Sequence, residues 1–133
     1  MQQKDFVEKQ IEAIGRFLAG LFSKLGLADV NPAAAAEEAG RDMEEELGFS
    51  LEAILEMPEG ELIKTLSQSG KFDAANFEKL ADVLALLGEK QNNINLYSKA
   101  LYLYRHLEQE SREYSVARNK KISAIKALIT PLT

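Results

Sequence analysis

The sequence predicts an all-α protein built from antiparallel helical hairpins. Apolar side chains recur along its 133 residues at steps of three and four, the spacing that puts them on one face of a helix. Helix-capping residues, prolines and single glycines separate these runs. The length and the 46% hydrophobic content suit one globular core. We therefore expect a single helical domain over residues 1–133.

The composition excludes several kinds of chemistry and location. The chain has no cysteine, which rules out disulfides, thiolate metal sites and thiol nucleophiles. No run approaches the ~18 apolar residues of a membrane-spanning helix. Charged residues interrupt the first apolar segment, so it lacks the core of a signal peptide. We expect a cytoplasmic protein that does not bind membranes.

Charge is unevenly distributed along the chain. Residues 29–62 carry eleven acids and one base, Arg41, whereas residues 89–133 carry eight bases and four acids. These two segments could attract each other within one molecule or between two. The ordinary alternative is that the charges coat solvated helix faces, where exposed pairs contribute little.

Residues 1–28 have the pattern of an amphipathic helix that ends at Gly26. Its apolar stripe comprises Phe6, Val7, Ile11, Ile14, Phe17, Leu18, Leu21, Phe22 and Leu25. This stripe could pack against the rest of the domain, against a second copy, or on a membrane surface. A membrane-surface helix is usually rich in lysine and arginine on its polar face, and this one mixes both signs. The sequence therefore favours core or dimer packing.

Residues 29–70 predict a series of acidic short helices. Asn31 can cap the first of them and Pro32 suits its first position, so that this helix extends to Leu47. Three glutamates at 44–46 oppose the helix dipole, and we expect that end to fray or to be held by tertiary contacts. Further helix boundaries are predicted at Gly48, Ser50, Pro58 and Gly70.

Residues 73–130 predict a helical hairpin followed by a third helix. Asp73 caps the most apolar run in the chain, which extends to Leu87. An asparagine-rich break over residues 89–95 precedes a second periodic run, as in an antiparallel hairpin. Gly88 and Ala100 would let the two backbones approach. A final helix up to Pro131 could be the first helix of a next unit or a capping helix. As a cap, it would carry four basic residues on its outer face: Arg118, Lys120, Lys121 and Lys126.

The hairpin resembles a tetratricopeptide repeat, a helical unit of 34 residues. Aligned from Ala81 to Tyr114, the matching positions are Leu84 at the usual tryptophan, Leu87 and Gly88 at the Leu-Gly pair, Ala100 at the alanine and Tyr104 at the following aromatic. The departures are Gln91 for tyrosine, Leu107 for a small residue and Arg112 for the terminal proline. About three stacked repeats are needed for a continuous core, so one unit must pack on other helices.

The resemblance also implies a partner-binding face on the first helix of the hairpin. The corresponding positions are Asp82, Ala85, Glu89, Asn92 and Asn93. The lysine and asparagine set with which peptide-binding relatives hold a C-terminal carboxylate is missing there. A peptide of basic character would suit Asp82 and Glu89 better. The whole chain is similar to a small bacterial family of uncharacterised helical proteins, a domain of unknown function, which implies no activity.

Catalytic and nucleic-acid functions find little support in the sequence. His106 is the only histidine, and we expect it on the outer side of its helix. Paired acid and base groups and a glycine-rich phosphate loop are both missing, so we expect no enzyme, metal or cofactor. An acidic protein is also a poor candidate for binding nucleic acid.

Two functions remain open. The first is a noncatalytic helical interaction module that holds a protein or peptide partner in a groove. The second is an architectural homo-oligomer, possible as a homodimer, formed through the N-terminal amphipathic helix.

Overall fold

The computed structural model describes residues 2–27, 32–111 and 115–129, with side chains except those of residues 2–4 and 32. Within these ranges the chain forms helices and no strand, which confirms the all-α prediction. The helices are α1 (Gln2–Leu27), α2 (Pro32–Leu47), α3 (Leu51–Glu56), α4 (Glu59–Gln68), α5 (Ala74–Gln91), α6 (Ile94–Glu110) and α7 (Val116–Ile129). None of these helices is long and apolar enough to cross a membrane.

Local sequence signals account for several helix boundaries. The Ser50 hydroxyl accepts the Ala53 N–H at 3.1 Å and begins α3, and the Asp73 carboxylate accepts the Asn76 N–H at 2.9 Å and begins α5. Gly48, with φ of +87°, follows α2 in a conformation that favours glycine. The predicted cap Asn31 lies outside the described residues.

The break between α5 and α6 is shorter than the polar stretch in the sequence indicates. Helix α5 continues past Gly88 to Gln91, and only Asn92 and Asn93 separate it from α6. Asn92 adopts the left-handed conformation, with φ of +52°, which asparagine tolerates better than most residues. The Asn93 side chain accepts the Asn95 N–H at 2.9 Å and caps α6.

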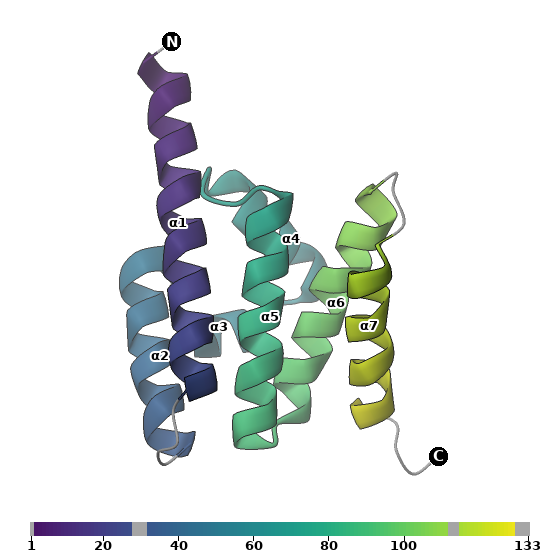
Figure 1. Ribbon diagram of the computed structural model, residues 1–133. Helices are drawn as coiled ribbons and strands as arrows, with labels where there is room; N and C mark the ends of the chain where they lie inside the picture. The colour runs from purple at the N-terminus through teal and green to yellow at the C-terminus, as the bar shows by residue number, and fades with distance from the viewer. Residues whose placement is uncertain (1, 28–31, 112–114, 130–133) are drawn as a thin grey trace.

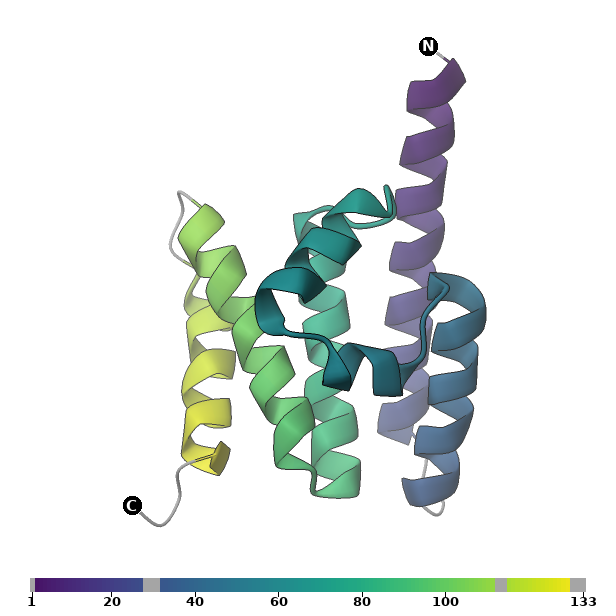
Figure 2. The ribbon, with the colours of Figure 1, turned by 180° about the vertical axis from the view of Figure 1, so that it is seen from behind.

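Helix α5 lies at the centre of the molecule (Figure 1). It pairs antiparallel with α6. Helix α1 packs on the other side of α5 and α7 packs on α6, and both α1 and α7 run in the same direction as α5. Helix α2 packs on α1, and the short helices α3 and α4 lie behind, as the reverse view shows (Figure 2). The core is densest at the α5–α6 contact, where Leu80, Leu84, Leu87, Leu96, Ala100 and Leu103 are fully buried.

Polar side chains connect the outer helices to this core. Asn76 is 2% exposed, and its amide donates to the carbonyls of Ile11 at 2.8 Å and Lys71 at 2.9 Å, which joins the start of α5 to α1. The Lys71 ammonium donates to the carbonyl of Glu46 at 3.4 Å. This cation lies at the acidic end of α2, so that end is held by a tertiary contact.

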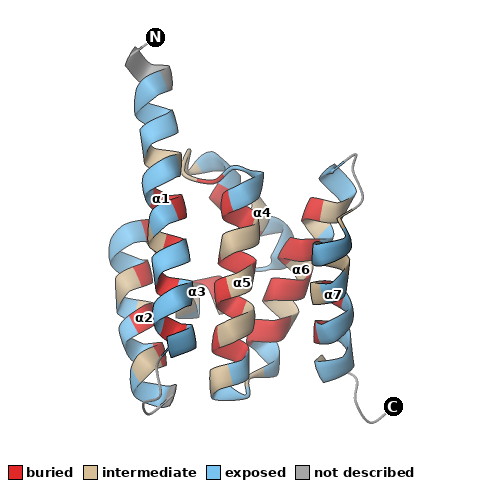
Figure 3. Ribbon diagram, viewed as in Figure 1, coloured by how far each residue is buried: buried red, intermediate tan, exposed pale blue. Residues whose placement is uncertain are grey.

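Helix α1 is buried over only part of its length. Ile14, Leu18 and Leu25 belong to the core, whereas Phe6 is 63% exposed and Val7 is 40% exposed. The first turns of α1 project beyond the other helices, and their described residues are almost entirely exposed (Figure 3). The apolar stripe therefore continues past the part of the domain that covers it.

Candidate functional site

An open groove of about 420 Å³ lies along α5, between α1 and α7. Four helices line it, with Phe22 from α1, Asp82, Ala85, Leu86 and Glu89 from α5, Tyr97 and Tyr104 from α6, and Lys121, Ile125 and Leu128 from α7. Its volume is within the usual range for ligand pockets in proteins. Residues from four helices, distant from one another along the chain, therefore line one groove.

The sides of the groove are apolar and reach solvent. Phe22 is 43% exposed and Leu128 is 52% exposed, and they face the groove from α1 and α7 respectively. Ala85 and Leu86 on α5 line the same groove and are half-buried, and Ile125 on α7 is buried. Burying such side chains removes apolar surface from water, which stabilises an association by roughly 25 cal/mol per Å². The groove therefore presents apolar side chains that an apolar segment could cover.

A network of charged and hydroxyl groups lies at one end of the groove. The Lys121 ammonium lies 3.0 Å from the Asp82 carboxylate and 3.2 Å from that of Glu78. The buried Tyr104 hydroxyl donates a hydrogen bond to Asp82. Burial, together with this hydrogen bond, raises the pKa of Tyr104 far above its usual range. Asp82 is thus already paired within the protein.

Arg118 continues the network away from the groove. Its guanidinium donates to Glu78 on α5 and to Glu108 on α6, each at 2.8 Å. Burial disfavours the charged form of Glu78, but hydrogen bonds from Arg118 and Lys121 outweigh it and lower the pKa of this carboxyl. The expectation that Arg118 and Lys121 coat the outer face of α7 is therefore wrong, because both side chains turn toward α5.

Glu89 has a different environment at the other end of the groove. It is exposed in the last turn of α5 and forms no ion pair with any residue that the structure describes. Burial raises the pKa of Tyr97, and the Glu89 carboxylate raises it further. Both side chains line the groove, and of its two acids Glu89 is the one without an ion pair to a described residue.

The five residues predicted to bind a partner occupy two places. Asp82, Ala85 and Glu89 line the groove. Asn92 and Asn93 form the turn between α5 and α6, where the first takes the left-handed conformation and the second caps α6. The sequence did not indicate Phe22, Lys121 or Leu128, because they come from the two helices at opposite ends of the chain.

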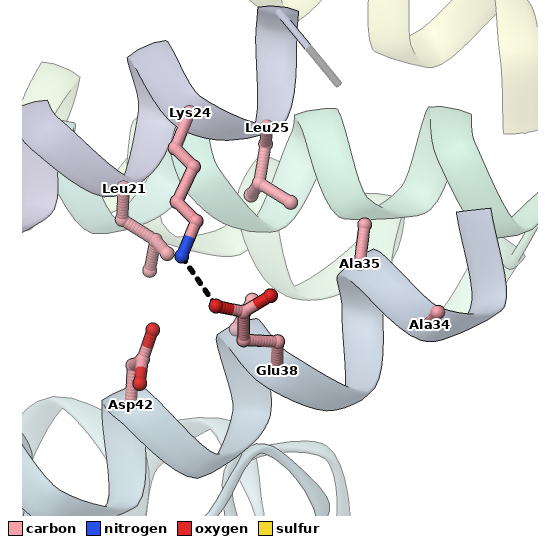
Figure 4. Close-up of a pocket in the computed structure, with 8 residues that line it drawn as sticks. Leu21, Lys24, Leu25, Ala34, Ala35, Glu38 and Asp42 are labelled. Atoms are coloured by element: carbon pink, nitrogen blue, oxygen red, sulfur yellow. Dashed lines mark hydrogen bonds and ion pairs between the residues drawn. The ribbon is translucent and has the colours of Figure 1, made fainter. Parts of the chain in front are cut away.

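A second, smaller hollow of about 210 Å³ lies between α1 and α2 (Figure 4). Leu21, Leu25 and Ala35 form part of its apolar lining, and an ion pair of 2.5 Å between Lys24 and Glu38 crosses it. Both charged side chains are more than half exposed, so this pair adds little to stability. The hollow has room for about one apolar side chain.

Metal binding and histidine chemistry gain no support from the geometry. In the described part of the chain, no three histidine, aspartate or glutamate side chains are grouped so that they could hold a metal ion. His106 is half-buried, with its ring centroid 5.8 Å from that of Phe77. It thus packs against α5, in contrast to the expected position on the outer side of its helix.

No family model, curated protein or solved structure matches this chain, so its function has to be inferred from its own residues.

Proposed function

We propose that this protein is a noncatalytic interaction module that holds a segment of a protein partner in the groove between α1, α5 and α7. The observation that carries the proposal is the exposure of Phe22 and Leu128 on the two sides of one apolar groove. Monomeric proteins rarely leave a contiguous apolar surface open unless it has a binding role. A helix laid into such a groove would cover both side chains.

The ion pairs beside the groove support this function by fixing its walls. Arg118 and Lys121 connect α7 to carboxylates on α5 and α6, and the half-buried setting of these pairs limits their screening by salt. Helix α1 is joined to α5 through Asn76. A groove whose sides are already in place loses less conformational entropy when a partner binds.

We further propose that the α5–α6 hairpin is tetratricopeptide-like. A β-carbon on Gly88 would lie 3.2 Å from the Tyr97 ring and 3.3 Å from both the Asn93 carbonyl and Leu96, so the two helices approach closely there. Ala100 is fully buried in the same hairpin. In such a unit the first helix faces the partner, and α5 supplies the floor of the groove.

The proposal can be tested with two pairs of matched variants. Phe22→Asp and Leu128→Asp place a charge in the groove, whereas Phe6→Asp and Val116→Asp place the same charge on exposed apolar positions of the same helices outside it. Proteins captured from a lysate by the wild type should be lost with the first pair and kept with the second. A purified partner should then show the same pattern in a binding titration. Equal binding by all four variants would refute the groove as the binding site.

The alternative function, an architectural homo-oligomer formed through α1, rests on a separate observation. Phe6 and Val7 lie exposed on the turns of α1 that project beyond the other helices. Deleting α1 would remove core side chains, so the double variant Phe6→Ser, Val7→Ser is the cleaner test. Light scattering should show a dimer for the wild type and a monomer for this variant. A monomeric wild type would exclude the alternative.

A further inference from the structure

The charges around the groove define the kind of helix that fits it and the direction in which that helix runs. Helices α1, α5 and α7 run in the same direction, and their C-terminal ends lie at the same end of the molecule (Figures 1 and 2). A helix C-terminus carries about half a negative charge from its aligned peptide dipoles. Three such ends lie at the end of the groove at which Glu89 lies, together with one positive end, the N-terminus of α6.

The charged side chain that lines the groove at this end is a carboxylate. Glu89 lines the groove, while Lys24, Lys90 and Lys126, the bases in the last turns of the three helices, are not among its lining residues. Lys24 is also paired with Glu38 on the side that faces α2. The charged group that a bound segment would contact at this end is therefore a carboxylate.

The other end of the groove is close to neutral. Lys121 is paired with Asp82 at 3.0 Å, and the Tyr104 hydroxyl donates to the same carboxylate. An incoming charge would have to compete with these contacts. The groove thus combines apolar sides with one acidic end, and it distinguishes the two directions of a helix by charge.

On the basis of the proposed function, we propose that the partner segment is an amphipathic helix that runs antiparallel to α5 and carries lysine or arginine in its first turn. In that direction the positive end of its dipole and its basic side chains lie beside Glu89 and the three helix C-termini. Its apolar face lies between Phe22 and Leu128. The reversed direction would bring the negative end of the partner helix to the acidic end of the groove.

Two peptides of identical composition test this direction. Each is a capped model helix with leucines on one face and alanines elsewhere, and three lysines stand in the first turn of one peptide and in the last turn of the other. We expect the full-length protein to bind the first peptide about fivefold more tightly in fluorescence anisotropy, from the combined dipole and ion-pair contributions. Raising the salt concentration should reduce this difference.

Substitutions in the protein test the direction of the bound helix separately from the groove as its binding site. Glu89→Lys should abolish or reverse the preference, while Glu110→Lys, the same change at an exposed acid outside the groove, should leave it intact. Leu128→Asp should weaken both peptides. Equal binding of both peptides that is lost in Leu128→Asp would keep the groove but overturn the direction.

Two other outcomes would overturn the proposal. One shows that the groove binds no helix of this kind, and the other shows that a second copy of the chain occupies it. If neither peptide binds up to about 1 mM, the groove is not a site for helices of this kind. If the protein sediments as a dimer that Leu128→Asp converts to a monomer, a second copy occupies the groove.

Discussion

Substituting Gly88 by alanine measures how closely α5 and α6 approach. A new β-carbon would lie 3.2 to 3.3 Å from the Tyr97 ring, the Asn93 carbonyl and Leu96, all tighter than ordinary contact. Overfilling a packed site costs about 1–3 kcal/mol. Alanine also favours the helix over glycine by about 0.5–1 kcal/mol. The crowding dominates, so Gly88→Ala should destabilise the protein by roughly 0.5–2 kcal/mol.

Gly20→Ala is the matched control because Gly20 also lies inside a helix but has no atom within 4 Å of its added β-carbon. In this variant alanine adds its higher helix propensity without any crowding, so the protein should be stabilised by about 0.5–1 kcal/mol. Urea unfolding followed by circular dichroism gives both free energies, provided that the m-values agree. If Gly88→Ala is as stable as Gly20→Ala, the close approach of the two helices does not constrain this position and the packing argument fails.

Three further changes test other contacts. Ala100→Leu adds bulk at a fully buried position and should lower the free energy of unfolding by about 1–3 kcal/mol; an unchanged urea midpoint would contradict the tight packing of the hairpin. Asn76→Ala leaves two carbonyls without their donor and should cost about 1–3 kcal/mol, with faster hydrogen exchange where α1 meets α5. Glu78 has a pKa held below its ordinary value of 4.5, so its ion pairs stabilise the fold above that pH and are lost as the pH falls through the lowered pKa. Wild type should therefore lose more stability on acidification below about pH 4.5 than Glu78→Gln, and identical pH profiles would show that these pairs do not hold α7.

The sequence predicted the helices well where local chemistry decides the backbone. Ser50 and Asp73 cap helices because each side chain accepts an N–H three residues later, a contact that needs no knowledge of the fold. Gly48 and Gly70 were predicted as helix boundaries, and both have a positive φ, which glycine adopts more readily than other residues. The same reasoning placed the hairpin break too early, since Gly88 serves helix packing and leaves the turn itself to Asn92.

Side-chain partners were harder to predict because they depend on how distant helices pack. The basic residues of α7 suggested a solvated outer face, but Arg118 and Lys121 reach carboxylates about forty residues earlier in the chain. Periodicity identifies which positions share a helix face, but it does not show which other helix that face meets. His106 was misplaced for the same reason, since Phe77 packs against it from α5.

One part of the groove could be predicted from the sequence and another part could not. The resemblance to a tetratricopeptide repeat pointed to three residues of its floor, Asp82, Ala85 and Glu89, all on α5. Its sides depend on α1 and α7 lying on either side of the α5–α6 hairpin, an arrangement that brings Phe22 into the same hollow as Leu128. The packing also separates the two acids. Asp82 is paired with Lys121 and joins α7 to α5, whereas Glu89 forms no ion pair with a described residue and is the acid that the proposed partner would contact. Because Lys121 on α7 neutralises Asp82, the proposed direction of a bound helix depends on the packing of α7 as well as on the sequence of α5.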